Sequence, residues 1–240
     1  MHPRIVGRPP HAFTLIELLV VIAIIIILAG LLYPAYSAIQ SQAKRTQAKN
    51  DLTQIVTAVN AFYTEYGRYP TTATNNVVYG STVINVRLPG PAPADFANNV
   101  LFNELRACTA ASPSCSAAGV LNTRQIVFIS PPNVKDPANP RSGIGISGTG
   151  APAPVGQFWD PWGMPYTVTI DGDYTNSVPN PYGVQTTGGA GSDPVQIGVI
   201  AWSLGSDQAL GTKILPPNVG DNVYKNPTTG AQSDDVISWQ

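Results

Sequence analysis

The sequence predicts an α+β protein. A long N-terminal helix, first hydrophobic and then amphipathic, packs against a small antiparallel β-sheet with long irregular loops. Three patterns support this fold class. The segment Phe13–Tyr33 is apolar apart from a single charge. Apolar residues then recur three and four positions apart as far as Tyr66, the period of an amphipathic helix. Near the C-terminus, Tyr166–Ile170 alternates as a strand does, and Gln196–Ser203 is the next strand-like segment.

Residues 13–34 are the predicted hydrophobic transmembrane or assembly helix, and residues 1–12 precede it as a short basic leader. The segment from Phe13 to Tyr33 would form a helix about 31 Å long, enough to cross a bilayer. Its single charge, Glu17, is costly, because an ionised carboxylate near hydrocarbon costs at least ~2.5 kcal/mol. Such a charge implies a partner, and the partner it implies is another copy of this chain.

Three interpretations of the hydrophobic segment compete. The first is a cleaved signal peptide with Ala35-Tyr36-Ser37 as its cleavage site, but the apolar core is long for one and Glu17 fits badly within it. The second is a plain membrane anchor. In the third, the chain is cut before the apolar run, between Ala12 and Phe13.

Residues 35–67 are predicted to continue as an amphipathic stalk helix. Gly67, with Pro70 shortly after it, marks the end of this helix. A stripe of this kind is ordinary core packing against a sheet. Its apolar positions are Leu52, Ile55, Val56, Val59, Phe62, Tyr63 and Tyr66.

Residues 68–240 are predicted to form a globular head. Its first part, 71–157, is variable and loop-rich, with one short helix at Ala94–Ala107 and one short buried strand at Ile126–Ile129. The second part, 158–240, holds the two clearer strands. No internal repeat and no nucleotide-binding glycine pattern is found in the sequence.

Composition argues against several classes of function. The two histidines, His2 and His11, precede Phe13, so a chain cut at that point has no histidine for acid–base catalysis or zinc binding. From Phe13 onward 11 basic residues stand against 14 acidic ones, which provides no electrostatic footprint for nucleic acid. Charged residues make up only 11%, with 22 glycines and 23 prolines, which suits an extracellular or filament protein better than a cytosolic enzyme.

Cys108 and Cys115 are separated by six residues in a loop rich in Thr, Ala and Ser. This spacing is typical of neither a redox motif nor a zinc site. In an oxidising compartment the two cysteines are expected to form a local disulfide that clamps the loop. In a reducing compartment they would be free thiols.

The residues around the third cleavage point resemble the type IV prepilin family. That family has a short basic leader, a small residue, then Phe-Thr-Leu-Ile-Glu and a hydrophobic helix. This chain has Ala12 followed by Phe13-Thr14-Leu15-Ile16-Glu17. Ala12 departs from the usual Gly, though it too is small. The resemblance implies a prepilin peptidase that cuts after Ala12 and methylates the new amino group of Phe13.

After such a cut, Phe13 carries a cationic amine one helical turn before Glu17. Both charges are costly to leave unpaired in a dry environment. Packing subunits side by side with an axial stagger brings Glu17 of one chain to the Phe13 amine of its neighbour. The pairing neutralises both charges and sets the register of a helical filament.

A second resemblance is carried by three blocks in the C-terminal part: Phe158-Trp159-Asp160-Pro161-Trp162-Gly163-Met164-Pro165-Tyr166, Ala201-Trp202-Ser203-Leu204-Gly205-Ser206-Asp207 and Asp234-Asp235-Val236-Ile237-Ser238-Trp239. These blocks are similar to the major pseudopilin (the G-type subunit) of the type II secretion system. The resemblance implies a calcium ion held by the last loop, with Asp207 and Asp234 or Asp235 as carboxylate ligands, the Leu204 carbonyl as a backbone ligand, and Asp221 as a weaker addition.

Two departures bear on the calcium prediction. Twenty-six residues separate Asp207 from Asp234, more than expected, and Gln208 replaces a usual Gly. The alternative is that these aspartates cap turns, as Asp commonly does. For Asp160, next to Trp159 and Trp162, a tight turn with indoles packed over the sheet is favoured over a sugar-binding platform.

These resemblances imply a non-enzymatic, structural subunit of a periplasmic pseudopilus that drives type II protein secretion. The implied partners are other copies of the chain, a prepilin peptidase, an inner-membrane assembly platform and minor pseudopilins. The implied location is the bacterial inner membrane, crossed once, with the head in the periplasm. The alternatives are a major or minor subunit of a surface type IV pilus for adhesion, motility or DNA uptake, an enzyme, and a monomeric exported binding domain released by cleavage after Ser37.

Overall fold

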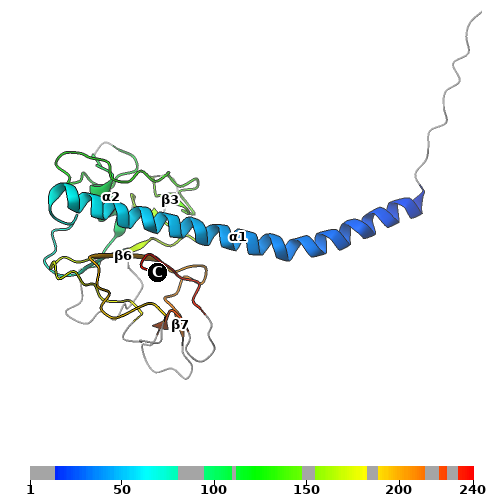
Figure 1. Cartoon of the computed structure of the whole chain (residues 1–240). Coiled ribbons are helices and arrows are strands. Elements are labelled where there is room, and N and C mark those ends of the chain that lie inside the picture. The colour runs from blue at the N-terminus through cyan, green and yellow to red at the C-terminus, as the bar shows by residue number, and fades with distance from the viewer. Residues whose placement is uncertain are drawn as a thin grey trace, which may run out of the picture. The chain divides into compact units, whose positions relative to one another are not determined.

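The computed structural model describes residues 14–80, 95–109, 112–147, 155–182, 189–213, 222–225 and 232–240 (Figure 1). Contacts within the chain divide it into two compact units, Met1–Ala43 and Lys44–Gln240. The described elements, in chain order, are α1 (Leu15–Tyr66), β1 (Val77–Tyr79), β2 (Asp95–Phe96), α2 (Asn98–Leu105), β3 (Gly143–Ile144), β4 (Phe158–Trp159), β5 (Thr167–Ile170), β6 (Val199–Ser203), β7 (Thr212–Lys213), β8 (Asn222–Val223) and β9 (Val236–Ile237).

A single helix, α1, accounts for both predicted helical segments. It runs for 52 residues and ends at Tyr66, directly before the predicted stop at Gly67. The main sheet has five strands in the order β2-β1-β5-β6-β9. All neighbours in it are antiparallel except β1 and β2, which are parallel. The two strands predicted near the C-terminus correspond to β5 and β6. The predicted α+β fold class, a long helix packed against an antiparallel sheet, is confirmed.

The main core lies between α1 and the sheet. Figure 1 shows the second half of α1 beside β6. On α1 the side chains of Leu52, Ile55, Val59 and Phe62 are fully buried, at the positions that the sequence pattern predicts. Fully burying an aliphatic or aromatic side chain stabilises a fold by about 1.5–3 kcal/mol. These four positions of the predicted stripe therefore form the contact with the core, whereas Val56 and Tyr66 are only partly buried and Tyr63 is 40% exposed.

The opposite face of the sheet is buried as well. In β6, Val199 and Ala201 belong to the core under α1, whereas Ile200 and Trp202 belong to a second apolar cluster. That cluster also contains Tyr182, and Trp239 packs against it. Because successive side chains of a strand point to opposite faces, a strand buried on both sides has a continuous apolar run. This explains why Val199–Ser203 has no polar alternation.

The prediction of a buried strand at Ile126–Ile129 is wrong. The structure assigns no strand there, and Val127 is 59% exposed. The backbone groups of this segment bond elsewhere: the amides of Phe128 and Ile129 both donate to the Leu105 carbonyl, at 2.8 and 3.3 Å. The segment thus covers the C-terminal end of α2, where carbonyl groups lack helical partners.

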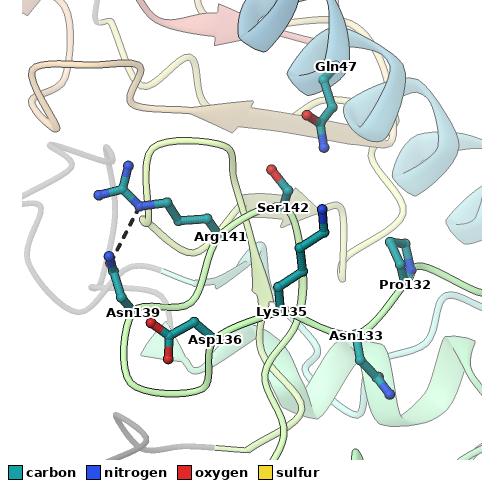
Figure 2. A pocket seen from close by; sticks show the side chains of 8 residues that line it. All are labelled: Gln47, Pro132, Asn133, Lys135, Asp136, Asn139, Arg141 and Ser142. Carbon is teal, nitrogen blue, oxygen red and sulfur yellow. Dashed lines mark hydrogen bonds between the residues drawn. The ribbon is translucent and has the colours of Figure 1, made fainter. Parts of the chain in front are cut away.

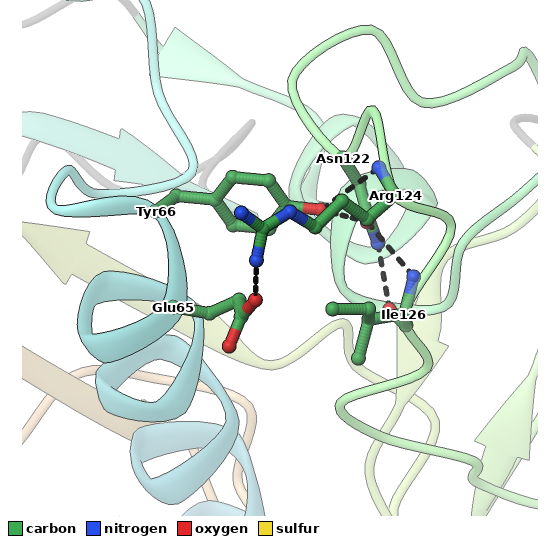
Figure 3. A network of polar contacts seen from close by, with 5 residues as sticks. All are labelled: Glu65, Tyr66, Asn122, Arg124 and Ile126. Atoms are coloured by element: carbon green, nitrogen blue, oxygen red, sulfur yellow. Dashed lines mark hydrogen bonds and ion pairs between the residues drawn. The ribbon is translucent and has the colours of Figure 1, made fainter.

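A side-chain network holds the same segment in place (Figure 3). Asn122 mimics a strand partner for Ile126, since its Oδ1 accepts from the Ile126 amide at 3.0 Å and its Nδ2 donates to the Ile126 carbonyl at 2.7 Å. The Tyr66 hydroxyl donates to the same Oδ1 at 2.7 Å. Arg124 pairs with Glu65 on α1 and lies over the Tyr66 ring. These contacts attach the end of α1 to the loop after α2.

The short helix predicted at Ala94–Ala107 is present but shorter, as α2, Asn98–Leu105. Asp95 and Phe96 instead form β2, which pairs with β1. Beyond α2, Cys108 and Cys115 form a disulfide with their Cα atoms 5.7 Å apart. Arg106 donates to the carbonyl and the hydroxyl of Ser114, each at 2.8 Å, inside the same loop.

The carboxylate of Asp51, beside the core, should make the free energy of unfolding depend on pH. Asp51 on α1 accepts a hydrogen bond from the Tyr166 hydroxyl at 2.8 Å. Burial, with a smaller contribution from the charge of Asp160, raises the pKa of Asp51 above its ordinary value, although the Tyr166 bond opposes the rise. The folded state therefore favours the protonated form. The stability that comes from protonating Asp51 in the folded state is fully present below the pKa of Asp51 in the unfolded chain. It is lost as the pH rises through the pKa of Asp51 in the folded protein.

We therefore expect Asp51→Asn to stabilise the protein at pH 7, because the amide still accepts from Tyr166 and never ionises. The gain should shrink as the pH falls toward 3.8, the ordinary pKa of the group. Melting temperatures of both proteins across this range measure the effect. Asp136→Asn, at an exposed carboxyl, is the control. An Asp51→Asn advantage that does not change with pH would contradict the expectation.

Candidate functional site

The start of α1 contains a capping box that the sequence interpretation missed. The amide and the hydroxyl of Thr14 donate to Glu17 Oε2 at 2.8 and 2.7 Å, and the Glu17 amide donates back to Thr14 Oγ1 at 3.3 Å. This is the Thr-x-x-Glu pattern at a helix N-terminus, in which two side chains satisfy free backbone amides. The pattern Thr14-Leu15-Ile16-Glu17 was available as a signal.

The capping box corrects one premise of the sequence analysis. In the separate chain Glu17 is not without partners, because Thr14 donates two hydrogen bonds to it. Any contact with a neighbouring chain has to compete with, or add to, these bonds. Ala12 and Phe13, the predicted processing and assembly residues, lie outside the described part of the chain.

The next turns of α1 expose apolar side chains on all sides. The exposed fractions range from 47% at Val21 to 89% at Leu15. A helix that is apolar all round is stable in water only when something else covers it. The exposed large side chains are Leu15, Ile16, Leu18, Leu19, Val20, Val21, Ile22, Ile24, Ile25, Ile26, Ile27 and Leu28. Among the residues that the structure describes, no helix combines the length and the apolar character of a membrane span.

A second site brings together three aspartates that are distant in sequence. Carboxylate oxygens of Asp207, Asp234 and Asp235 all lie within 4.8 Å of one another. β6 and β9 pair antiparallel, with Ser203 opposite Val236, so the end of β6 and the beginning of β9 lie at the same edge of the sheet. Asp207 follows β6, and the other two aspartates directly precede β9. Strand pairing therefore closes the interval of 26 residues.

β9 is also attached to the helix, which fixes the acidic cluster relative to α1 within the head. Lys49 Nζ donates to the Ile237 carbonyl at 2.8 Å, and to the carbonyl of Gln240. Burial lowers the pKa of Lys49. The segment that contains Asp234 and Asp235 is thus held through β9, which pairs with β6 and is bonded to Lys49 of α1.

Asp234 organises the turn that carries Asp207. Its Oδ2 accepts from the Ser206 hydroxyl at 2.6 Å and from the Asp207 amide at 3.1 Å. Burial disfavours its charge, but these hydrogen bonds outweigh burial and lower its pKa. Gly205 is required here, since it has φ +68° and a Cβ at this position would lie 2.5 Å from the Asp234 carbonyl.

The ionised forms of Asp207 and Asp235 are less favoured in the folded protein than that of Asp234. Burial, followed by repulsion from Asp234, raises the pKa of Asp207, although Ala209 donates its amide to Oδ1 at 2.9 Å. Burial raises the pKa of Asp235 to about 6, and this side chain is only 3% exposed. Its Oδ2 accepts from the Tyr182 hydroxyl at 2.7 Å and from the Gly211 amide at 2.6 Å.

The remaining oxygen of Asp235, Oδ1, is buried and has no hydrogen-bond partner among the described residues. A buried carboxylate oxygen without a donor is costly. Converging carboxylates are the ligands that calcium prefers. The residues present therefore fit a hard divalent cation, while Asp207 and Asp234 also cap the turn as the alternative interpretation expects. Leu204 lies in the same turn with its side chain buried, and Asp221 lies outside the described residues.

Asp160 has a structural role, as the sequence favours. Its Oδ1 accepts the amides of Trp162, Gly163 and Met164 at 2.8–2.9 Å, which closes a tight turn. Its Oδ2 accepts the Ser203 hydroxyl at 2.6 Å. Burial raises its pKa against the lowering effect of these bonds. Every oxygen of this carboxylate is used, which leaves nothing for a ligand.

Comparisons with known proteins find similarity in part of the chain. Residues 8–33 match the family described as the prokaryotic N-terminal methylation motif. The chain is 42% identical over 59 residues to the type IV major pilin protein PilA of Myxococcus xanthus, which covers 25% of this chain and 27% of that protein. It is 40% identical over 65 residues to the type II secretion system core protein G of Pseudomonas aeruginosa, which covers 27% of this chain and 46% of that protein.

The chain thus spans about a quarter and about half of the lengths of these two relatives. No solved structure matches the chain. The similarity is type IV pilin-like and is shared by a pilus protein and a secretion protein. It is a likeness to structural, non-enzymatic proteins, as the sequence predicts.

Proposed function

We propose that this protein is a structural subunit that is held in the bacterial inner membrane by residues 13–34 and polymerises through the same residues into a helical filament. The observation that carries the proposal is the start of α1, where apolar side chains are exposed on every side behind a single carboxylate. Lipid covers such a surface before assembly, and neighbouring copies cover it afterwards. The match to a methylation motif over residues 8–33 supports the same reading.

Glu17 and the amine of Phe13 form the joint between subunits in this proposal. A prepilin peptidase cuts after Ala12 and methylates Phe13, and Glu17 of one copy then pairs with that amine in the next. One oxygen of Glu17 is occupied by Thr14, so the carboxylate is already oriented at the end of the helix. The cost of leaving two charges unpaired in an apolar filament core favours the paired register.

The filament we propose is a periplasmic pseudopilus that drives type II protein secretion. Likeness of the C-terminal blocks to the major pseudopilin supports this choice, together with the relative named as a secretion core protein. An inner-membrane assembly platform and minor pseudopilins are the further partners. The second candidate is a surface type IV pilus, favoured by the slightly stronger similarity to a major pilin.

In the head, Asp207, Asp234 and Asp235 hold a calcium ion, with the Leu204 carbonyl as a backbone ligand. Oδ1 of Asp235, which has no hydrogen-bond partner in the described part of the chain, supports this assignment. Bound calcium would supply the positive charge that three converging carboxylates lack, and it would fasten the turn after β6 to the residues before β9.

The N-terminal residue of the protein purified from membranes tests the proposal. We expect Phe13 bearing one methyl group, read by peptide mass spectrometry. Ala12→Gly should be processed equally, because both residues are small, whereas Ala12→Leu should accumulate the uncut chain. A mature protein that begins at Ala38 would instead indicate an exported soluble domain and would refute the filament.

A further inference from the structure

A cavity of about 560 Å³ lies in the head, between α1 and the loop that follows Pro131. In Figure 2, Gln47 points down from α1 into it, and Lys135 and Ser142 point up from the loop. The volume is in the range of sites for small organic molecules, ~300–1,000 Å³. The lining residues are Gln47, Pro132, Asn133, Lys135, Asp136, Asn139, Arg141 and Ser142.

The loop that forms this cavity is held at both ends. The Ile144 amide donates to the Pro132 carbonyl at 2.8 Å, and the Val134 amide donates to the Ile144 carbonyl at 2.9 Å. The two backbones run side by side as a parallel bridge at Asn133 and Ile144, so closely that a Cβ on Gly143 would lie 2.5 Å from the Pro132 carbonyl. The Ser142 amide donates to the Asp160 carbonyl at 2.9 Å, which attaches the loop to the buried turn. These backbone hydrogen bonds preorganise the lining of the cavity, so that less conformational entropy is lost when a ligand binds.

The charges along the cavity are mostly positive and unpaired. Neither Lys135 nor Arg141 makes an ion pair with a described residue, and both are exposed. Within the part of the chain that the structure describes, Arg141 Nε donates to Asn139 Oδ1 alone, at 3.4 Å. The single carboxylate, Asp136, is already engaged, since its Oδ1 accepts the Ala138 amide at 2.9 Å. Two cations therefore line the cavity, together with three amides and a hydroxyl.

We propose that this cavity binds a small organic anion that carries one phosphate or carboxylate together with hydroxyl groups. Arg141 and Lys135 bind the anionic group, because charge-assisted hydrogen bonds to such groups are the stronger ones. Gln47, Asn133 and Ser142 offer donors and acceptors to the hydroxyl groups. The inference is independent of filament assembly, because every residue in it belongs to the head.

The test uses the full chain in detergent and isothermal titration calorimetry with four probes: glucose 1-phosphate, glucuronate, inorganic phosphate and glucose. We expect saturable binding of the two sugar anions, weaker binding of inorganic phosphate and none of glucose. Arg141→Gln and Lys135→Gln should each weaken the binding by about tenfold, the loss expected for one charge-assisted bond. Binding should also weaken with added salt.

The matched control is Arg68→Gln, which also removes an exposed cation. Arg68 lies just after the C-terminal end of α1, about 30 Å along the helix direction from Gln47. This variant should bind as the wild type does. Equal losses from Arg68→Gln and Arg141→Gln would reveal non-specific attraction and overturn the site. Absence of saturable binding by both sugar anions would also overturn it, and inorganic phosphate binding as tightly as glucose 1-phosphate would remove the role assigned to the amides.

Discussion

Glu17→Gln is expected to abolish filament assembly while leaving the chain in the membrane. Glutamine suits the same position of a capping box, so the hydrogen bonds from Thr14 and the start of α1 should persist. What is lost is the negative charge that pairs with the Phe13 amine of the next subunit. An amine buried without its partner costs about 3–5 kcal/mol. A penalty of that size at every subunit contact prevents polymerisation.

Thr14→Ala is the matched variant. It removes both contacts of the Thr14 hydroxyl, keeps the bond from the Thr14 amide to the Glu17 carboxylate, and keeps the charge of Glu17. Losing a cap costs about 1 kcal/mol, and only at the end of the helix. Sheared filaments quantified by immunoblot, with the membrane fraction as reference, should therefore be almost normal for Thr14→Ala and absent for Glu17→Gln. If both variants lose filaments equally, Glu17 acts through the cap and the intersubunit pair is refuted.

Calcium is expected to raise the melting temperature of the protein by about 5–10 °C when its concentration is 100 times the dissociation constant. Binding at that excess stabilises a folded state by about 2.7 kcal/mol. For a domain of this size, each kcal/mol corresponds to about 2–4 °C. Magnesium should have a smaller effect, because it is smaller and demands a stricter octahedral geometry. Chelation should return the melting temperature to its starting value.

Asp235→Asn separates metal binding from ordinary stability. Its amide oxygen still accepts from Tyr182 and Gly211, but the buried negative charge is gone. Without calcium we expect this variant to be at least as stable as the wild type at pH 7, and with calcium clearly less stable. Asp173→Asn, at an exposed aspartate outside the cluster, should respond to calcium normally. A wild type that shows no shift at millimolar calcium, or a shift retained by Asp235→Asn, contradicts the site.

Most of the helical structure could be predicted from the sequence, because its signals are local. The apolar stripe from Leu52 to Phe62 marks the buried face of α1 correctly, and the helix ends where Gly67 follows. Thr14 and Glu17 carry a capping signal within four residues, although it was overlooked. The turn at Asp160 was likewise predictable, since Oδ1 of its carboxylate accepts three amides that lie two to four residues further along the chain.

The sequence pattern was misleading where tertiary contacts compete for the backbone. Ile126–Ile129 is apolar and β-branched enough to resemble a strand, but Asn122 and the end of α2 take its hydrogen bonds. The predicted helix at Ala94–Ala107 loses its first turn because Asp95 and Phe96 pair with β1. A backbone amide that bonds to one acceptor is no longer available for another. The free energy of the contacts with distant residues therefore decides which hydrogen bond forms.

By itself, the sequence determined what depends on neighbours in the chain: the continuous helix, its buried stripe and the lone carboxylate at its apolar end. The tertiary structure decided how distant residues meet. A family resemblance suggested Asp207 with Asp234 or Asp235, and the pairing of β6 with β9 brings all three together and leaves one buried oxygen of Asp235 without a donor among the described residues. The close pairing of the segments around Asn133 and Ile144 places Lys135 and Arg141 beside a cavity that α1 completes with Gln47. The periodicity that predicts a helix is visible in consecutive residues. Contacts between distant residues depend instead on strand pairing and on packing across the whole fold.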